Sequence, residues 1–333
     1  MAKAKNGSLN QAAINKEDEF YTQISDIEKE LRHYKKQFQG KIVFCNCDDP
    51  DWSNFFKYFQ LNFWELGLKK LISTHYEADK PTYKLEIIAE EKKSGQIGIP
   101  EYKKTMLTGN GDFRSPECVE LLKEADIVCT NPPFSLFREY VAQLIAYDKK
   151  FLIIGNQNNI TYKEVFPLLQ SNKMWLGYYS GDMAFKVPDY YEPRETRFWI
   201  DETGQKWRSF GNITWFTNLD TTKRHEELTL YKTYTPEEFP KYDNYDAINV
   251  NKVNEIPCDY FGVMGVPITF LDKYNPDQFE IVGITDRQDS YGFRTHKYTV
   301  EEYKNANDLN ARACLLINGK PKAIYARILI KRK

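Results

Sequence analysis

The four residues Asn131-Pro132-Pro133-Phe134 are the part of this 333-residue chain whose types and spacing most directly indicate chemistry. An aromatic amine is a poor nucleophile because its lone pair is delocalised into the ring. The Asn131 side-chain oxygen and the Pro132 carbonyl would accept its N–H bonds and favour a more tetrahedral nitrogen. The prolines restrict the turn, and Phe134 offers a face on which an extruded base can stack. The motif predicts an enzyme that methylates the amino group of a base.

Three further loops, residues 46–50, 76–79 and 109–113, are expected near this motif. They are polar or acidic, and none contains a Gly-x-Gly-x-x-Gly pattern or a Walker lysine for phosphates. Carboxylates instead suit the hydroxyl and amino groups of a nucleoside that carries an amino acid. The sequence therefore favours S-adenosylmethionine over NAD or ATP. No metal site is predicted, because Cys45-Asn46-Cys47 lacks the ligand spacing of a zinc site.

Alternating apolar strands and helices are predicted to position these loops. Strands are expected at 41–46, 68–76, 127–130 and 151–154, and helices at about 25–38, 52–66, 116–124, 135–147 and 162–170. A hairpin-like excursion is expected at 82–107, and 174–179 with 213–217 would close one edge of the sheet. This order predicts an α/β fold with a doubly wound, mostly parallel sheet, which binds ligands at the carboxyl ends of its strands.

The chain divides into three predicted parts. Residues 1–15 are polar and patternless and are expected to form a flexible arm. Residues 16–220 would form the catalytic domain that binds S-adenosylmethionine. Residues 221–333 are rich in Tyr, Asn and Pro and would form an accessory region. Between Arg287 and Lys333 eleven lysines and arginines face four acidic residues, a basic tail that would neutralise phosphates or form a solvated surface.

Composition limits the class of protein further. Hydrophobic residues make up 41% and charged residues 28%, as in globular proteins. The net charge of −1 does not by itself indicate a nucleic-acid partner. No apolar run reaches the roughly 20 residues that span a bilayer, and the N-terminus lacks the apolar region of a signal peptide. The six scattered cysteines are read as reduced thiols, so a cytoplasmic location without membrane contact is predicted.

Longer strings resemble a known family, the adenine-specific DNA methyltransferases of the EcoRI modification-methylase type. The matching strings are Phe20-Tyr21-Thr22, Cys45-Asn46-Cys47-Asp48-Asp49-Pro50, Gly111-Asp112-Phe113, the run Thr130 to Phe137, the run Trp215 to Asp220, the run Tyr242 to Val250 and the run Gly262 to Phe270. The resemblance runs from about Asp18 to Phe279. The short Asn-Pro-Pro-Phe motif is shared by many amino-group methyltransferases, whereas the longer strings are specific.

The resemblance implies a role for each site residue. Tyr21 and Thr22 would lie by the methionine part of the cofactor, Asp48 at the end of the first strand, Glu77 at the ribose hydroxyls, Asp112 and Phe113 beside the cofactor's adenine or the target site, and Asn131, Pro132 and Phe134 around the flipped adenine. Asp79 or Glu86 could replace Glu77 at the ribose. The family's pattern departs from most amino-methyltransferases in one respect, because Cys47-Asp48-Asp49-Pro50 stands where a glycine-rich turn is usual.

The same resemblance implies the substrate and the setting, and it makes residues 221–333 the DNA target-recognition region. The substrate would be double-stranded DNA, methylated at the N6 of an adenine within a short palindrome such as GAATTC. The setting would be a restriction–modification system or a phage, with a cognate restriction endonuclease as a possible partner acting on the same site. The parts that match least well, 82–105 and 285–320, leave the recognition sequence open.

Three other functions use related features. An RNA or protein-amide N-methyltransferase could use the same Asn-Pro-Pro-Phe grip, and a non-catalytic DNA-binding relative would keep the fold with a degenerate cofactor site. Cytosine N4 methylation usually goes with Ser or Thr in place of the leading asparagine. The large region after residue 220 and the intact Asn131, Pro132 and Phe134 favour DNA adenine methylation.

Overall fold

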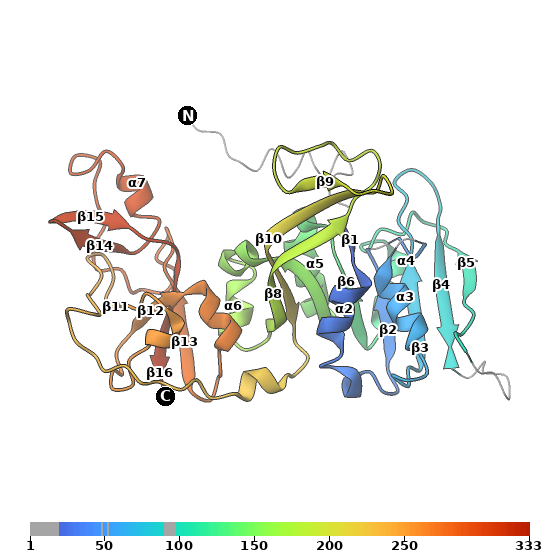
Figure 1. The fold of residues 1–333 in the computed structure, drawn as a ribbon, viewed down its shortest axis with the longest axis horizontal. Helices are drawn as coiled ribbons and strands as arrows, with labels where there is room; N and C mark the ends of the chain where they lie inside the picture. The colour runs from blue at the N-terminus through green and yellow to red at the C-terminus, as the bar shows by residue number, and fades with distance from the viewer. Residues whose placement is uncertain (1–19, 48, 52, 90–97) are drawn as a thin grey trace. The chain divides into compact units, whose positions relative to one another are not determined.

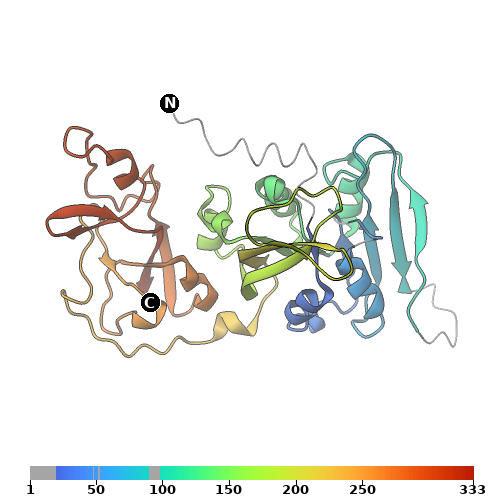
Figure 2. The ribbon, with the colours of Figure 1, turned by 45° about the horizontal axis from the view of Figure 1, so that its top comes forward.

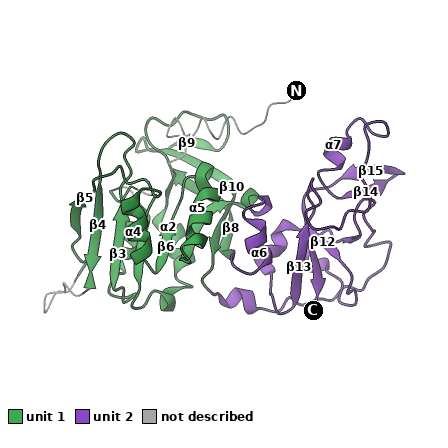
Figure 3. Cartoon of the chain, turned by 180° about the vertical axis from the view of Figure 1, so that it is seen from behind, with its two compact units in different colours: residues 1–159, 176–219 green, residues 160–175, 220–333 purple. Residues whose placement is uncertain are grey.

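The computed structural model describes residues 20–47, 49–51, 53–89 and 98–333, which form two compact units (Figure 3). Unit 1 comprises residues 1–159 and 176–219, and unit 2 comprises residues 160–175 and 220–333. Residues 160–175, assigned above to the catalytic part, group with unit 2. The predicted arm, residues 1–15, lies outside the described residues.

In the described part of the chain, unit 1 is built on a ten-stranded sheet. Its order is β1-β8-β10-β7-β6-β2-β3-β4-β5, with β9 paired to β10. The strands are β1 (Tyr21–Thr22), β2 (Ile42–Cys45), β3 (Lys70–Thr74), β4 (Tyr83–Ile88), β5 (Lys103–Met106), β6 (Ile127–Thr130), β7 (Lys150–Asn156), β8 (Trp175–Lys186), β9 (Phe198–Ile200) and β10 (Lys206–Thr217). The four central strands, β3, β2, β6 and β7, are parallel. Antiparallel β4 and β5 form one edge (Figures 1 and 2).

Helices cover both faces of this sheet, which confirms the predicted α/β, doubly wound class. The helices are α2 (Ile24–Leu31), α3 (Asn54–Leu61), α4 (Pro116–Glu124) and α5 (Phe137–Ala146), with 3-10 turns η1 (Lys35–Gln37), η3 (Phe134–Leu136) and η4 (Gln157–Thr161). Figure 1 shows α2 and α3 in front of the sheet, and Figure 3 shows α4 and α5 from behind. Central strands therefore have both faces buried, as in Val43, Phe44 and Cys45.

Local capping explains where these helices begin and end. The Ser53 hydroxyl accepts a hydrogen bond from the Phe55 N–H (3.1 Å), so α3 starts two residues later than the predicted range 52–66. It ends at Leu61, where the Asn62 side-chain amide donates to the Tyr58 carbonyl (2.8 Å). The predicted helix 25–38 is interrupted after Leu31, and a 3-10 turn follows. None of the helices among the described residues is long and apolar enough to cross a membrane.

Unit 2 contains short strands and few helices. A four-stranded sheet has the order β11-β12-β16-β13 and a two-stranded sheet pairs β14 with β15. The elements are α6 (Phe166–Gln170), η5 (Thr222–His225), β11 (Ile248–Asn249), η6 (Val253–Glu255), β12 (Met264–Pro267), η7 (Ile268–Lys273), β13 (Phe279–Ile284), α7 (Ala306–Leu309), β14 (Cys314–Ile317), β15 (Lys320–Ala323) and β16 (Arg327–Arg332).

The basic stretch at the C-terminus is not a tail. Arg327–Arg332 forms the inner strand β16, paired on both sides with β12 and β13. Ile328, Leu329 and Ile330 of this strand are fully buried. Arg332 is held by the Cys258 carbonyl and lies 5.0 Å from the Phe261 ring centre. A truncation after Ala326 would therefore remove the centre of the unit 2 sheet, not merely surface charge.

Candidate active site

Asn131 directly follows β6, at the carboxyl end of the parallel strands, and its side chain is buried. Its amide nitrogen Nδ2 donates a hydrogen bond of 2.6 Å to the backbone carbonyl of Phe20. Because the two atoms of an amide group point in different directions, this bond fixes the side of Asn131 on which Oδ1 lies. Pro132 is also buried, and Pro133 precedes η3 with φ −54°. The turn thus holds the asparagine in one orientation.

Phe134 is the first residue of η3 and belongs to an aromatic cluster. Its ring stacks on Phe20, with centres 5.3 Å apart and planes at 28°. The rings of Phe185 on β8 and Phe210 on β10 meet it edge-on, at 6.4 and 5.9 Å. Phe134 itself is half-buried. The face expected to receive a base is therefore bordered by aromatic side chains and contacts Phe20 in this structure.

Cys47 stands where most amino-methyltransferases have a glycine, and it adopts the backbone conformation that glycine favours. Its φ is 75°, in the left-handed region. The preceding Asn46 ties this turn to the rest of the site: its side-chain oxygen accepts from the Tyr140 hydroxyl, and its carbonyl accepts from Thr130. Cys47 therefore has, at this one position, a backbone conformation that glycine favours.

His75, just after β3, connects several strand ends. Its Nε2 lies 3.4 Å from Asp49 Oδ2, its Nδ1 contacts the Thr82 hydroxyl, and its ring stacks on Tyr83 at 4.9 Å. The Tyr83 hydroxyl donates to Asp51 Oδ2 at 2.6 Å. Burial raises the pKa of Asp49, although the Asp51 N–H and His75 oppose this shift. The cluster fixes the loop after β2 against the loop after β3.

The loop after β3 also meets residues 109–113. The Glu77 N–H donates to the Asn110 carbonyl at 2.9 Å. Gly111 has φ 76°, and a Cβ on it would overlap the His75 carbonyl, so this position requires glycine. The Glu77 carboxylate is partly exposed, 4.0 Å from Lys80 Nζ. Glu77 therefore lies in the loop where the resemblance expects it.

Asp112 and Phe113 lie next to the start of α4, and both have partners within the protein. The Asp112 carboxylate pairs with Arg114 at 2.6 Å. Burial alone would raise the pKa of Asp112, but hydrogen bonds from Arg114 outweigh it and lower the pKa. Phe113 is only 5% exposed and packs edge-on against Tyr140 of α5, with ring centres 5.1 Å apart. The structure thus places Phe113 in the core behind the loop.

Two alternatives to Glu77 differ clearly in position. Glu86 lies within β4, opposite Ile72, and its carboxylate pairs with Lys70 and Lys84, each at 2.7 Å. It is therefore not in the strand-end loops. Asp79 is exposed in the loop after β3. Asp48, expected at the end of the first strand, lies outside the described residues.

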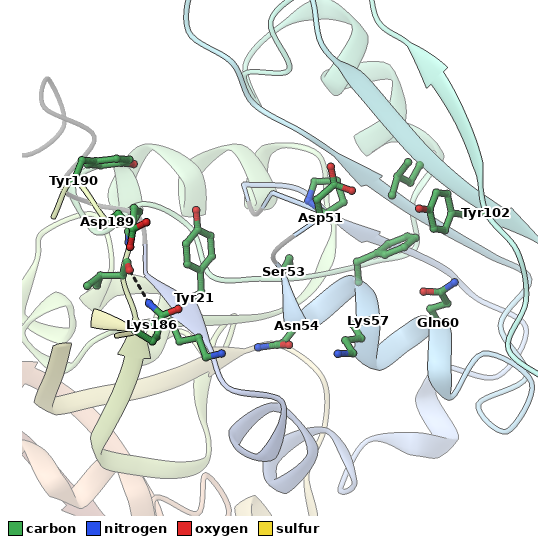
Figure 4. A pocket seen from close by; sticks show the side chains of 16 residues that line it. Tyr21, Asp51, Ser53, Asn54, Lys57, Gln60, Tyr102, Lys186, Asp189 and Tyr190 are labelled. Carbon is green, nitrogen blue, oxygen red and sulfur yellow. Dashed lines mark hydrogen bonds between the residues drawn. The ribbon is translucent and has the colours of Figure 1, made fainter. Parts of the chain in front are cut away.

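A pocket of about 750 Å³ opens beside β1 and the start of α3 (Figure 4). Its lining residues are Tyr21, Pro50, Asp51, Ser53, Asn54, Phe56, Lys57, Gln60, Leu85, Tyr102, Lys186, Val187, Pro188, Asp189, Tyr190 and Gln205. Of the predicted site residues that the structure describes, Tyr21 alone lines it. The sequence reasoning missed Asp51, Ser53 and Asn54. Their place in the sequence could have indicated them, because they lie at the start of the helix that follows the first buried strand.

The chemistry of these side chains fits a polar nucleoside-type cofactor. Two buried polar atoms near the strand ends, Thr22 Oγ1 and Asn46 Nδ2, have no hydrogen-bond partner among the described residues. A bound polar ligand would satisfy such groups. Carboxylates at Asp51 and Glu77 suit amino and hydroxyl groups. Within the described residues no cluster of His, Cys, Asp and Glu could hold a metal ion.

An Asn-Pro-Pro-Phe turn at the end of a strand, on an α/β sheet whose central strands are parallel, is typical of amino-group methyltransferases. Comparison of the chain with known proteins identifies the family. A family model described as "Adenine-specific methyltransferase EcoRI" matches residues 8–333. Type II methyltransferase M.EcoRI of Escherichia coli is 49% identical over 342 aligned positions, covering 99% of this chain and 98% of that protein. Type II methyltransferases M.MgeORF184P of Mycoplasma genitalium and M.MpnI of Mycoplasma pneumoniae are 39% and 37% identical, each covering 98% of both chains. No solved structure matches significantly.

The chain therefore belongs to the EcoRI family of adenine-specific methyltransferases. It is a DNA methyltransferase that uses a methyl donor, which confirms the family, fold class and enzyme class predicted from the sequence. The family's specificity for adenine leaves the cytosine and protein-amide alternatives without support.

Proposed function

We propose that the chain transfers a methyl group from S-adenosylmethionine to N6 of an adenine flipped out of double-stranded DNA. The observation that carries this proposal is the hydrogen bond from Asn131 Nδ2 to the Phe20 carbonyl. With Nδ2 on the side of Phe20, Oδ1 is the atom of Asn131 that can accept a hydrogen bond from the N–H of an incoming amine. The Pro132 carbonyl would accept the second N–H, and Phe134 would stack on the base.

The residues around the pocket would hold the cofactor. Tyr21 and the start of α3 would contact its methionine part, with Thr22 nearby. Glu77 would accept the ribose hydroxyls and Asp112 would border its adenine, while Phe113, packed against Tyr140, would support that loop from behind. When bound, S-adenosylmethionine supplies an electrophilic methyl group on a sulfonium centre.

The protein's own contribution to the reaction would be to orient the target amine. Asn131 and Pro132 accept N–H bonds and draw electron density toward the amine nitrogen, which becomes the nucleophile. An amide oxygen and a peptide carbonyl are too weakly basic to take up a proton. The proton that the methylated amine loses would therefore leave to solvent.

The DNA-reading function is assigned to residues 221–333, most of unit 2. This part contains the basic residues of the C-terminal region, which can neutralise phosphates. The Type II names of the relatives support a short, specific target site and a restriction–modification setting. A cognate restriction endonuclease that cuts the same site when it is unmethylated would then be the partner in the cell.

Two measurements test this function. Calorimetry should show S-adenosylmethionine binding to the protein without DNA. Long-read sequencing of DNA from cells that express the protein should show N6-methyladenine in one short motif, and the same cells expressing Asn131→Ala should lack it. Methylation on another base would overturn the assignment to adenine. Unchanged methylation by the folded Asn131→Ala protein would show that Asn131 does not bind the amine as proposed.

A further inference from the structure

The two-residue strand β1 is held along one edge by two asparagine side chains. Asn131 Nδ2 donates to the Phe20 carbonyl and Asn54 Nδ2 donates to the Thr22 carbonyl, each at 2.6 Å. Carbonyls two residues apart in an extended chain point to the same side. The main chain of Tyr21 and Thr22 is paired with Lys186 and Phe185 of β8. The segment is therefore fixed between a strand and two amide groups.

These two amides come from the two halves of the proposed site. Asn131 belongs to the turn that would grip the adenine, whereas Asn54 is the first residue of α3 and lines the pocket beside it. Tyr21, which lies between the two bonded carbonyls, lines the same pocket (Figure 4). Any shift of β1 would therefore change both the pocket wall and the support of Asn131.

We propose that Asn54 is a positioning residue that sets the orientation of Asn131 through β1. This inference rests on the proposed function and adds a residue to it. Loss of the Asn54 hydrogen bond leaves the Thr22 carbonyl without this donor. The position of β1 relative to α3 is then no longer fixed. Phe20 then no longer holds the Asn131 amide in one orientation. The consequence differs from that of an ordinary pocket residue, because methyl transfer slows even when cofactor and DNA are saturating.

The test uses Asn54→Asp and Asn54→Ala in the full-length protein. Aspartate has the shape of asparagine but donates no N–H when ionised, and a negative charge is favourable at a helix N-terminus, so α3 should persist. The matched control is Asn62→Ala, compared with Asn54→Ala, because neither change adds a charge to the helix ends. Asn62 Nδ2 donates to the Tyr58 carbonyl at 2.8 Å at the other end of the same helix, which is the same type of bond without contact to β1.

The measurements are the single-turnover rate of methyl transfer at saturating S-adenosylmethionine and DNA, the cofactor dissociation constant by calorimetry, and the melting temperature. Both Asn54 variants should lower the saturated rate by about 2- to 13-fold, the range expected for one buried hydrogen bond. Asn62→Ala should keep the wild-type rate. If the Asn54 variants match wild type at saturation, or if all three variants lose rate in proportion to melting temperature, the positioning role is wrong. A wild-type protein without methyl transfer would instead overturn the proposed function and this inference together.

Discussion

Replacing Asn131 by aspartate separates two roles of this side chain, which are to accept an N–H from the target amine and to donate a hydrogen bond to the Phe20 carbonyl. Aspartate keeps an oxygen that can accept an amine N–H, but its ionised form cannot donate to the Phe20 carbonyl, which Asn131 Nδ2 approaches to 2.6 Å. If accepting the amine were the whole role, Asn131→Asp would remain active. If the amide must also be held by Phe20, the ionised variant should be inactive although its acceptor remains.

The size of the effect follows from the burial of this position. Asn131 is only 5% exposed, so an ionised carboxylate there loses one hydrogen bond and faces a carbonyl oxygen at close range. Loss of a buried hydrogen bond amounts to about 0.5–1.5 kcal/mol, and an unsatisfied buried group adds about 1–3 kcal/mol. Together these predict a rate lower by about 10- to 2,000-fold when the carboxylate is ionised.

Burial also gives this variant a pH dependence with a defined sign. A buried carboxyl group has a raised pKa, and its protonated form can donate to Phe20 while its other oxygen accepts the amine. The rate of Asn131→Asp should therefore rise as pH falls, by up to about tenfold per unit above that pKa. Asn131→Ala, which has no titratable group here, should show no such rise.

The assay is single-turnover methyl transfer at saturating cofactor and DNA, measured from about pH 8.5 down to about pH 6 for wild type and both variants, a window that brackets a raised carboxyl pKa. Each rate is divided by the wild-type rate at the same pH. A flat ratio for Asn131→Asp, or wild-type activity at the high end, would refute the argument that Phe20 positions the amide.

Four other changes test separate parts of the site. Phe134→Ala should weaken capture of the flipped base by about 1–3 kcal/mol, seen as reduced 2-aminopurine brightening, with a smaller loss of turnover than Asn131→Ala. Cys47→Gly should fold and remain active, whereas Cys47→Val should lose at least about 1–2 kcal/mol of stability because φ is 75°, measured by thermal unfolding. Gly111→Ala should lower both cofactor affinity and melting temperature, since its Cβ would overlap the His75 carbonyl; unchanged calorimetry would contradict this. Asp112 has a lowered pKa in the fold, so its stabilisation is present above about pH 4 and is lost as pH falls further; acid unfolding of Asp112→Asn should lack that component.

The central strands and the Asn-Pro-Pro-Phe turn could be predicted from the sequence because their signals are local. Ile127–Thr130 is a short run of buried residues that ends directly at Asn131, and the structure has the same bounds. The helix 116–124 was equally well defined, since Ser115 caps it and Pro116 begins it. In both cases the residues that decide the structure are neighbours in the chain.

Other features depend on contacts that the sequence does not display. The basic C-terminal stretch has the charge of a solvated tail, yet Ile328, Leu329 and Ile330 make it an inner strand. The apolar run was visible, but its partners β12 and β13 are far away in the chain. Cys47 has no local signal for a positive φ, because its conformation is imposed by the strand ends around it.

The segment Phe20–Thr22 shows most clearly why a site cannot be assembled from motifs alone. Its resemblance to the family predicted that Tyr21 and Thr22 would face the cofactor, but gave Phe20 no role. In the structure the Phe20 carbonyl bonds Asn131, 111 residues away in sequence, and its ring stacks on Phe134. A base that stacks on Phe134 must share or displace this contact, so Phe20 supports the amide through its backbone while its ring competes for the aromatic face. The two roles are separable, because substitution of the Phe20 side chain leaves its carbonyl in place.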